Sequence, residues 1–151
     1  MSVADKTEGR HYVAAQLGEW MQLSQYRYEH PAFPGRPVPG KLFLKDLLKL
    51  SSVEISVNKL PAGKGVPFYH QHRQHEEVYL FIQGSGQFQV DGEVVDVREG
   101  TVISVMPDGK RAWRNNSTED LYYLCIQAER GSLSGDTITD GCKLEETVTW
   151  P

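Results

Sequence analysis

The chain has 151 residues, which is enough for one domain with a hydrophobic core and too short for two domains of ordinary size. Its net charge of −4 and pI near 5.7 exclude the basic footprint of a nucleic-acid-binding protein, so we expect no nucleic-acid partner. The longest apolar run is far shorter than the roughly 20 residues that span a bilayer, and the polar N-terminus lacks an apolar signal, so we expect no membrane partner and a cytoplasmic protein.

The first third of the chain has the composition of an arm that precedes the main domain. Residues 1–30 are polar and mixed, and prolines and glycines then recur through residues 31–40, which cannot form a helix. The leucines of residues 41–50 suit either a short helix or a strand. We assign residues 1–50 to this N-terminal arm, 51–128 to the main domain and 129–151 to a C-terminal tail.

From residue 53 onward the pattern is that of an all-β domain. Val53, Ile55 and Val57 alternate as in a strand, and Asp91-Gly92 is a strong hairpin signal. Further strands are expected at about 67–72, 77–83, 86–91, 93–97, 101–106, 111–115 and 121–128, with short late strands at 137–139 and 147–149 in the tail.

Several of these strands are apolar on both faces. In the strand that starts at Glu77, Val78 and Leu80 share one face while Tyr79 and Phe81 share the other. A sheet with its outer face in water would alternate, so either the arm or a second subunit must cover that face. We predict a homodimer, because two-fold dimers are the commonest closed assembly.

The segment His70-Gln71-His72 carries the strongest chemical signal in the chain. Alternate side chains of an extended segment share a face, so both imidazoles can aim at one point. Glu77 opens the next apolar strand and can bring a carboxylate beside them. Two nitrogens and one oxygen suit a divalent transition metal such as iron, zinc, nickel or manganese. The alternative interpretation is a polar hairpin with exposed histidines.

The same residues resemble the first sequence motif of the cupin superfamily, in which a glycine, an H-x-H pair, a glutamate and a second glycine follow one another: Gly65, His70, His72, Glu77 and Gly84. Only the spacing from Gly65 to His70 is one residue short of the family pattern. The resemblance extends over about residues 53–128 and implies a small single-domain cupin, of the cupin 2 conserved barrel type, folded as a double-stranded β-helix or jelly-roll barrel.

A second cupin-like motif begins at Gly100 but departs from the family at one position. The resemblance implies a histidine there as a fourth metal ligand, and this motif contains none. Counting from Gly100 places the position on Arg111, whereas counting from the proline and glycine of the motif places it on Ala112. We favour Arg111, because that register turns Trp113 into the barrel and a one-residue slip would expel it.

An arginine that points into a barrel is costly unless an anion meets it. Arg111 therefore has three interpretations. It holds an acidic group of a substrate beside a three-ligand metal, it repels cations and leaves a metal-free pocket, or it pairs with Glu77 and braces the barrel.

Two classes of function fit these residues. The first is a metal-dependent enzyme of the oxygenase or isomerase type, in which Arg111 anchors an acidic substrate and Tyr79 is a candidate acid. Phe81 and Trp113 would then form the apolar wall that binds the small-molecule ligand. Tyr79 has a competing interpretation as plain core, because aromatic side chains fill cores whatever the chemistry. The second class is a non-catalytic binding module for a sugar or an organic acid, with or without an ion.

Overall fold

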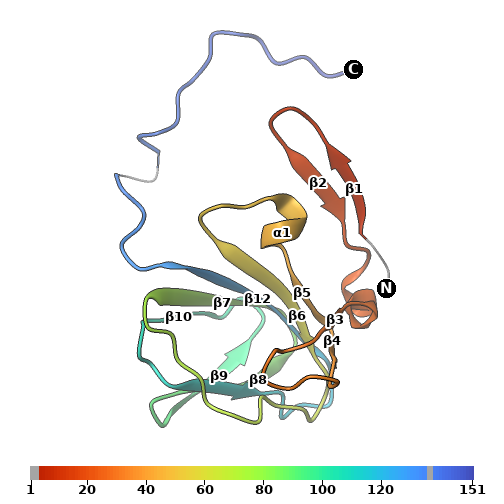
Figure 1. Ribbon diagram of the computed structural model, residues 1–151, viewed down its shortest axis with the longest axis vertical. Helices are drawn as coiled ribbons and strands as arrows, with labels where there is room; N and C mark the ends of the chain where they lie inside the picture. Colours follow the sequence, from red (N-terminus) through yellow and green to blue (C-terminus); the bar gives the residue numbers. More distant parts are fainter. Residues whose placement is uncertain (1–3, 136–137) are drawn as a thin grey trace.

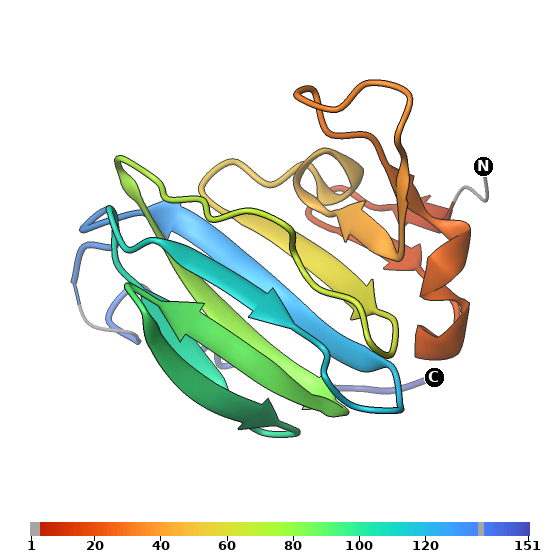
Figure 2. The ribbon, with the colours of Figure 1, turned by 90° about the horizontal axis from the view of Figure 1, so that it is seen from below.

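The computed structural model describes residues 4–135 and 138–151. Most of its regular structure is β-strand, and the strands of the main domain form two sheets with the hydrophobic core between them (Figure 1). Figure 2 shows the two sheets as separate layers, with the red and orange arm beside β5 and β6. The expected all-β, jelly-roll type barrel is confirmed.

The larger sheet has the antiparallel strand order β10-β7-β12-β6-β5. Its strands are β5 (Lys41–Phe43), β6 (Glu54–Leu60), β7 (His75–Gln83), β10 (Val102–Val105) and β12 (Leu121–Glu129). The central pair places Tyr79 opposite Cys125 and Phe81 opposite Tyr123. Because opposite residues share a face, this register directs all four side chains into the barrel.

The smaller sheet has the order β11-β8-β9, formed by β8 (Ser85–Val90), β9 (Glu93–Arg98) and β11 (Arg111–Arg114). The expected hairpin at Asp91-Gly92 is confirmed, because these two residues join β8 to β9. Their φ angles are 51° and 93°, the left-handed conformation that this pair of residue types adopts readily in two-residue turns.

The strand expected over residues 67–72 is present only as intermittent pairing. Gly65 and His70 form isolated bridges to Arg114 and Arg111 of β11. Between the two bridges Pro67 has no N–H to donate, so a continuous ladder cannot form. Both histidines of the H-x-H pair therefore lie on a coil that runs along the edge of the smaller sheet.

The barrel interior settles which of the two registers the second motif adopts. Arg111 and Asn115 are buried, and the Trp113 ring stacks on Phe88 with 5.5 Å between centroids and 6° between planes. The Trp113 indole also donates to the Tyr123 hydroxyl at 2.9 Å. The structure thus has the register that turns Arg111 and Trp113 inward.

The arm covers part of the outer face of the larger sheet, over β6 and β12. Its elements are β1 (Asp5–Glu8), β2 (Val13–Gln16), the 3-10 helix η1 (Trp20–Gln25), β3 (Arg27–Tyr28), β4 (Val38–Pro39) and α1 (Lys45–Leu48). Leu23 and Tyr26 form a second buried cluster with Val57 of β6 and Tyr122 of β12. We expected either the arm or a second subunit to cover this face, and the structure contains the arm in that place. Residues 41–50 form both structures that their pattern allowed, a strand that joins the larger sheet and then a short helix.

No helix of the described residues is long and apolar enough to cross a bilayer.

Beyond β12, the described part of the C-terminal tail is exposed and contains no regular strand. Residues 147–149 are exposed coil, so that expectation is wrong. Of the other expected strand, residue 137 lies outside the described residues, and residues 138–139 belong to a turn. A strand needs a neighbour for its backbone hydrogen bonds, and no described strand pairs with either segment.

The buried contact of the arm predicts that Leu23→Ala destabilises the fold by about 2 to 5 kcal/mol, because the substitution leaves a cavity against the sheet. Leu23 is 1% exposed, whereas Met21 two residues away is 72% exposed and is the matched control. Met21→Ala is expected to change the free energy of unfolding by less than about 0.5 kcal/mol. Urea unfolding monitored by circular dichroism measures both, and equal effects would show that the arm does not pack as described.

Candidate metal centre

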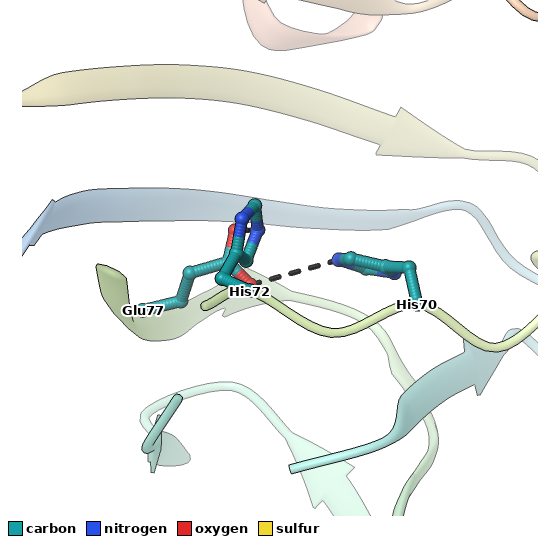
Figure 3. Close-up of side chains that lie close together, drawn as sticks. All are labelled: His70, His72 and Glu77. Carbon is teal, nitrogen blue, oxygen red and sulfur yellow. Dashed lines mark hydrogen bonds and ion pairs between the residues drawn. The ribbon is translucent and has the colours of Figure 1, made fainter. Parts of the chain in front are cut away.

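Three side chains of the first motif converge inside the mouth of the barrel. The donor atoms of His70, His72 and Glu77 all lie within 4.8 Å of one another. His72 Nε2 is 3.1 Å from Glu77 Oε1, and His70 Nε2 is 3.7 Å from Glu77 Oε2. Figure 3 shows the two imidazoles on the coil before β7 and the carboxylate on β7 itself, all directed to one region. The convergence expected from the sequence is present.

Backbone hydrogen bonds hold the coil that carries both histidines. The His70 amide donates to the Arg111 carbonyl at 3.2 Å, and the Arg111 amide donates back at 3.0 Å. The Asp108 amide donates to the His72 carbonyl at 2.8 Å. The two imidazoles are thus presented by a segment that is anchored at each histidine, although it is not a regular strand.

The distances between the donor atoms fit a single transition-metal ion. Ligands at about 2.0–2.2 Å from an ion lie roughly 3.0 to 3.5 Å apart at right or tetrahedral angles. The separations of 3.1 and 3.7 Å are close to this range. The remaining nitrogen of His70, Nδ1, is buried without a hydrogen-bond partner in the described structure. Because Nδ1 of His70 is buried, Nε2, which faces Glu77, is the nitrogen of this ring that is available to an ion.

The protonation states also suit metal binding. Burial lowers the pKa of His72, which favours the neutral imidazole that coordinates metals. Burial alone would raise the pKa of Glu77, but the nearby His70 and the hydrogen bonds from Tyr79 and Arg111 outweigh it and keep this carboxyl ionised. Cys125 is different, because burial and the nearby Glu77 raise its pKa to about 12 and leave a neutral thiol. The donor set is therefore two imidazoles and one carboxylate.

Arg111, the residue at which we expected the fourth ligand, is bonded to Glu77. Its side chain is 0% exposed, and its Nε and Nη2 donate to Glu77 Oε2 at 3.0 and 2.6 Å. Its Nη1 donates to the Gly109 carbonyl at 2.7 Å. Of the three interpretations of the inward arginine, the ion pair with Glu77 is the one that the structure contains. Arg111 stands behind the carboxylate and does not line the cavity in front of it.

The other site residues expected from the sequence divide between the cavity and the core. The Tyr79 hydroxyl is buried and donates to Glu77 Oε2 at 2.6 Å, and burial raises the pKa of this phenol. Phe81 lies in the core against Phe88 and Tyr123 instead of forming the pocket wall. Its position on β7 is farther from the mouth than that of Glu77, so its side chain fills the barrel interior. Trp113 lines the cavity.

A cavity of about 560 Å³ opens in front of the three donor atoms, and the arm builds part of its wall. The barrel contributes the motif residues with Tyr79, Trp113 and Tyr123. The arm contributes side chains that the motif search did not single out, among them Tyr28, His30, Phe33, Lys41 and Phe43. The alternation of Leu42 and Leu44 was a signal for Lys41 and Phe43, since leucines on the outer face of a strand place these neighbours on the inner face.

Comparison with known proteins identifies the family. The family model of the cupin domain matches residues 57–127. A crystal structure of a cupin protein from Bacteroides fragilis is 38% identical, with a TM-score of 0.67 over 78% of this chain and 97% of that one. The chain belongs to the cupin family.

Two further cupin-like structures share the fold at lower identity. A predicted oxalate decarboxylase from Thermotoga maritima is 21% identical, with a TM-score of 0.58 over 74% of this chain and 96% of that one. A provisionally assigned sugar phosphate isomerase from Acidithiobacillus ferrooxidans is 22% identical, with a TM-score of 0.58 over 68% and 66% of the two chains. None of the curated proteins matches this cupin.

The buried ion pair predicts that Arg111→Met destabilises the metal-free cupin by about 3 to 5 kcal/mol, because it leaves the Glu77 carboxylate buried without its cation. Arg114 is three residues further along the same strand, is exposed, and its side chain bonds to Gln87. Arg114→Met is therefore the matched control, with an expected effect below about 0.5 kcal/mol. Chemical denaturation of both variants provides the comparison.

The lowered pKa of Glu77 predicts how stability depends on pH. The folded protein holds this pKa below the ordinary value of 4.5, so the unfolded chain binds the proton first as the pH falls. The stabilisation is complete above about pH 5 and is lost progressively as the pH falls through 4.5 toward the folded pKa. Glu77→Gln removes this contribution. Its free energy of unfolding, measured on chelator-treated protein, should fall less between about pH 5 and pH 3 than that of the wild type. Equal pH dependence of the free energy of unfolding in the variant and the wild type would contradict the lowered pKa of Glu77.

Proposed function

We propose that this cupin binds a small anionic ligand at a divalent transition metal held by His70, His72 and Glu77. The observation that carries the proposal is the convergence of two imidazoles and one ionised carboxylate at a cavity wall. Three protein ligands and open positions for water or substrate are the usual arrangement of catalytic metal sites.

The residues around the centre have distinct tasks in this proposal. When bound, a divalent ion polarises a carbonyl or activates oxygen, the chemistry of an isomerase or an oxygenase. Arg111 and Tyr79 both bond to Glu77 Oε2, which fixes the rotamer of the carboxylate and leaves Oε1 toward His72. They are therefore better suited to positioning the ligand carboxylate than to the roles of substrate anchor and acid expected from the sequence.

The charge of the centre favours an anion. Arg111 carries a positive charge where the family pattern has a neutral histidine, and Glu77 neutralises it in the metal-free protein. A divalent ion then adds two charges that no further described acid at the centre offsets. A carboxylate or phosphate of the ligand reduces this excess, because interactions between charges are strong in a site that excludes water.

A non-catalytic binding module is the second candidate. The observation that favours it is the replacement of the fourth ligand by an arginine that already shares Glu77, because a nearby cation weakens metal binding. In that case the cavity binds a sugar or an organic acid without turnover. The metal-free form of this module differs from the first candidate in whether the protein retains a metal.

Metal analysis tests the proposal directly. The protein is purified without a metal-affinity tag. It is then expected to hold about one iron, zinc, nickel or manganese ion per chain. His70→Ala and His72→Ala should each lower the affinity at least about tenfold, since each removes a ligand. His75→Ala is the matched control, because His75 is near His72 but outside the group of donor atoms. Wild-type protein that binds none of these ions would support the binding module.

We also propose that the protein forms a homodimer. Beyond the arm, the outer face of the larger sheet keeps Val78, Leu80 and Ile126 only half-buried, and Val102 on the edge strand β10 is 59% exposed. Light scattering should give twice the mass of one chain, and Val102→Glu should shift the equilibrium toward one chain because it charges this face. A wild-type mass of one chain would overturn the dimer.

A further inference from the structure

Lys41 is a cation at the cavity wall whose charge the described protein does not neutralise. The register of β5 on β6 pairs Lys41 with Asn58 and Phe43 with Ser56, and these side chains share the inner face. The ammonium makes no ion pair with any acid of the described residues. Its contacts are the Asn58 side-chain oxygen at 2.9 Å and the Phe43 ring, whose centroid is 4.7 Å away.

The surrounding hydrogen bonds hold Lys41 without cancelling its charge. The Asn58 amide nitrogen donates to the carbonyl and the hydroxyl of Ser56, both at 3.0 Å, so its oxygen is left to face the ammonium. The contact with Phe43 is a cation–π interaction, which is weaker than an ion pair. Burial lowers the pKa of Lys41 although Glu77 and Glu54 act in the opposite direction. The ammonium is therefore partly desolvated and lacks a direct anionic partner.

The other lysine at this cavity shows the contrast. Lys59 forms an ion pair with Asp120 at 2.8 Å, and this partner raises its pKa. Arg111 is likewise neutralised by Glu77. Of the cations in or behind the cavity wall in the described chain, Lys41 is the one left to a ligand.

Much of the wall near the arm is aromatic. Phe33 lies 5.6 Å from Phe68 and 5.5 Å from His30 between ring centroids, and Tyr28 lies 4.9 Å from Phe43. Such a wall contacts the apolar body of a ligand and offers few partners for the many hydroxyl groups of a sugar.

We propose that Lys41 binds the acidic group of the ligand and that the ligand is a small acid, a carboxylate or a phosphate, with an apolar body in contact with the aromatic wall. This inference deepens the proposed function by naming the class of ligand, and it moves the anion anchor from Arg111 to the arm. A carboxylate or phosphate at Lys41 supplies the charged partner that the folded chain lacks, with the strength of a charge-assisted hydrogen bond.

The test is calorimetric titration of chelator-treated, full-length protein with three probes of similar shape. Phenylacetate and phenyl phosphate carry the two candidate anionic groups, and phenylacetamide is the neutral counterpart of the first. At least one anion is expected to bind about 10- to 100-fold more tightly than the amide, and the better anion identifies the acidic group. Equal affinities, or no binding of either anion, would overturn the proposal.

Two variants assign the effect to the residue. Lys41→Met should lower the affinity for the better anion about 10- to 100-fold while leaving that of phenylacetamide unchanged. Lys45→Met is the matched control, since Lys45 is an exposed lysine of the same arm outside the cavity wall. If Lys41→Met retains the wild-type affinity in a folded protein, the assignment is wrong. If Lys41→Met does not fold, Lys41→Gln replaces it as the test of the residue. The comparison of the anions with the amide on wild-type protein still tests the class of ligand.

The metal content separates this proposal from the preceding one. Lys41→Met is expected to hold the same ion as the wild type, because Lys41 touches none of the three proposed ligands. Anion binding by a protein that holds no metal would support Lys41 as the anchor and contradict only the proposed metal centre. Metal binding without selectivity for the anions would support the metal centre and contradict Lys41 as the anchor.

Discussion

The ion pair between Arg111 and Glu77 is the interaction on which both the barrel and its site depend. Glu77 belongs to β7 of the larger sheet and Arg111 to β11 of the smaller one, so the pair joins the two layers across the interior. Arg111 is 0% and Glu77 5% exposed, and each is bonded to the other and to neighbouring dipoles. Such a pair contributes modestly as a whole but is expensive to break from one side. The residue at the fourth position is therefore part of the architecture as well as of the chemistry.

The same pair determines how the centre can use its carboxylate. Arg111 and Tyr79 both bond to one oxygen of Glu77, while His72 and the Cys125 thiol approach the other. An ion at this position would share the carboxylate with a guanidinium, which a neutral fourth histidine would not require. Where the resemblance implies a direct ligand, the structure has a permanent charge behind the three candidate donors, and in the proposed function this charge favours an acid in the cavity.

The barrel and the central part of the site were predictable from the sequence, because both depend on local patterns. The alternation of strands, the Asp91-Gly92 turn and the H-x-H spacing each determine geometry over a few residues. The late strand expected at 147–149 was wrong because pairing depends on a partner elsewhere in the fold, which no local pattern supplies. The break in the strand at 67–72 had a signal in Pro67, whose missing N–H interrupts the ladder.

The site residues that the sequence did not reveal are those brought from a distance. Lys41 and His30 are separated from the H-x-H pair by the whole of β6, and only the folding of the arm over the barrel places them at the cavity. Phe81 shows the converse, since its inward parity was correct and its depth in the barrel was not expected. Parity along a strand tells which face a side chain occupies, but not whether the core or a cavity lies beneath it.

The division of the cavity wall between barrel and arm has an evolutionary consequence. Residues such as Trp113 and Tyr79 are constrained twice, because they pack the core as well as border the cavity. The aromatic side chains of the arm around Phe33 contribute less to core packing, since Phe33 itself is 42% exposed. Descendants of such a chain are free to diversify what they recognise by altering the arm, while the barrel is inherited almost unchanged.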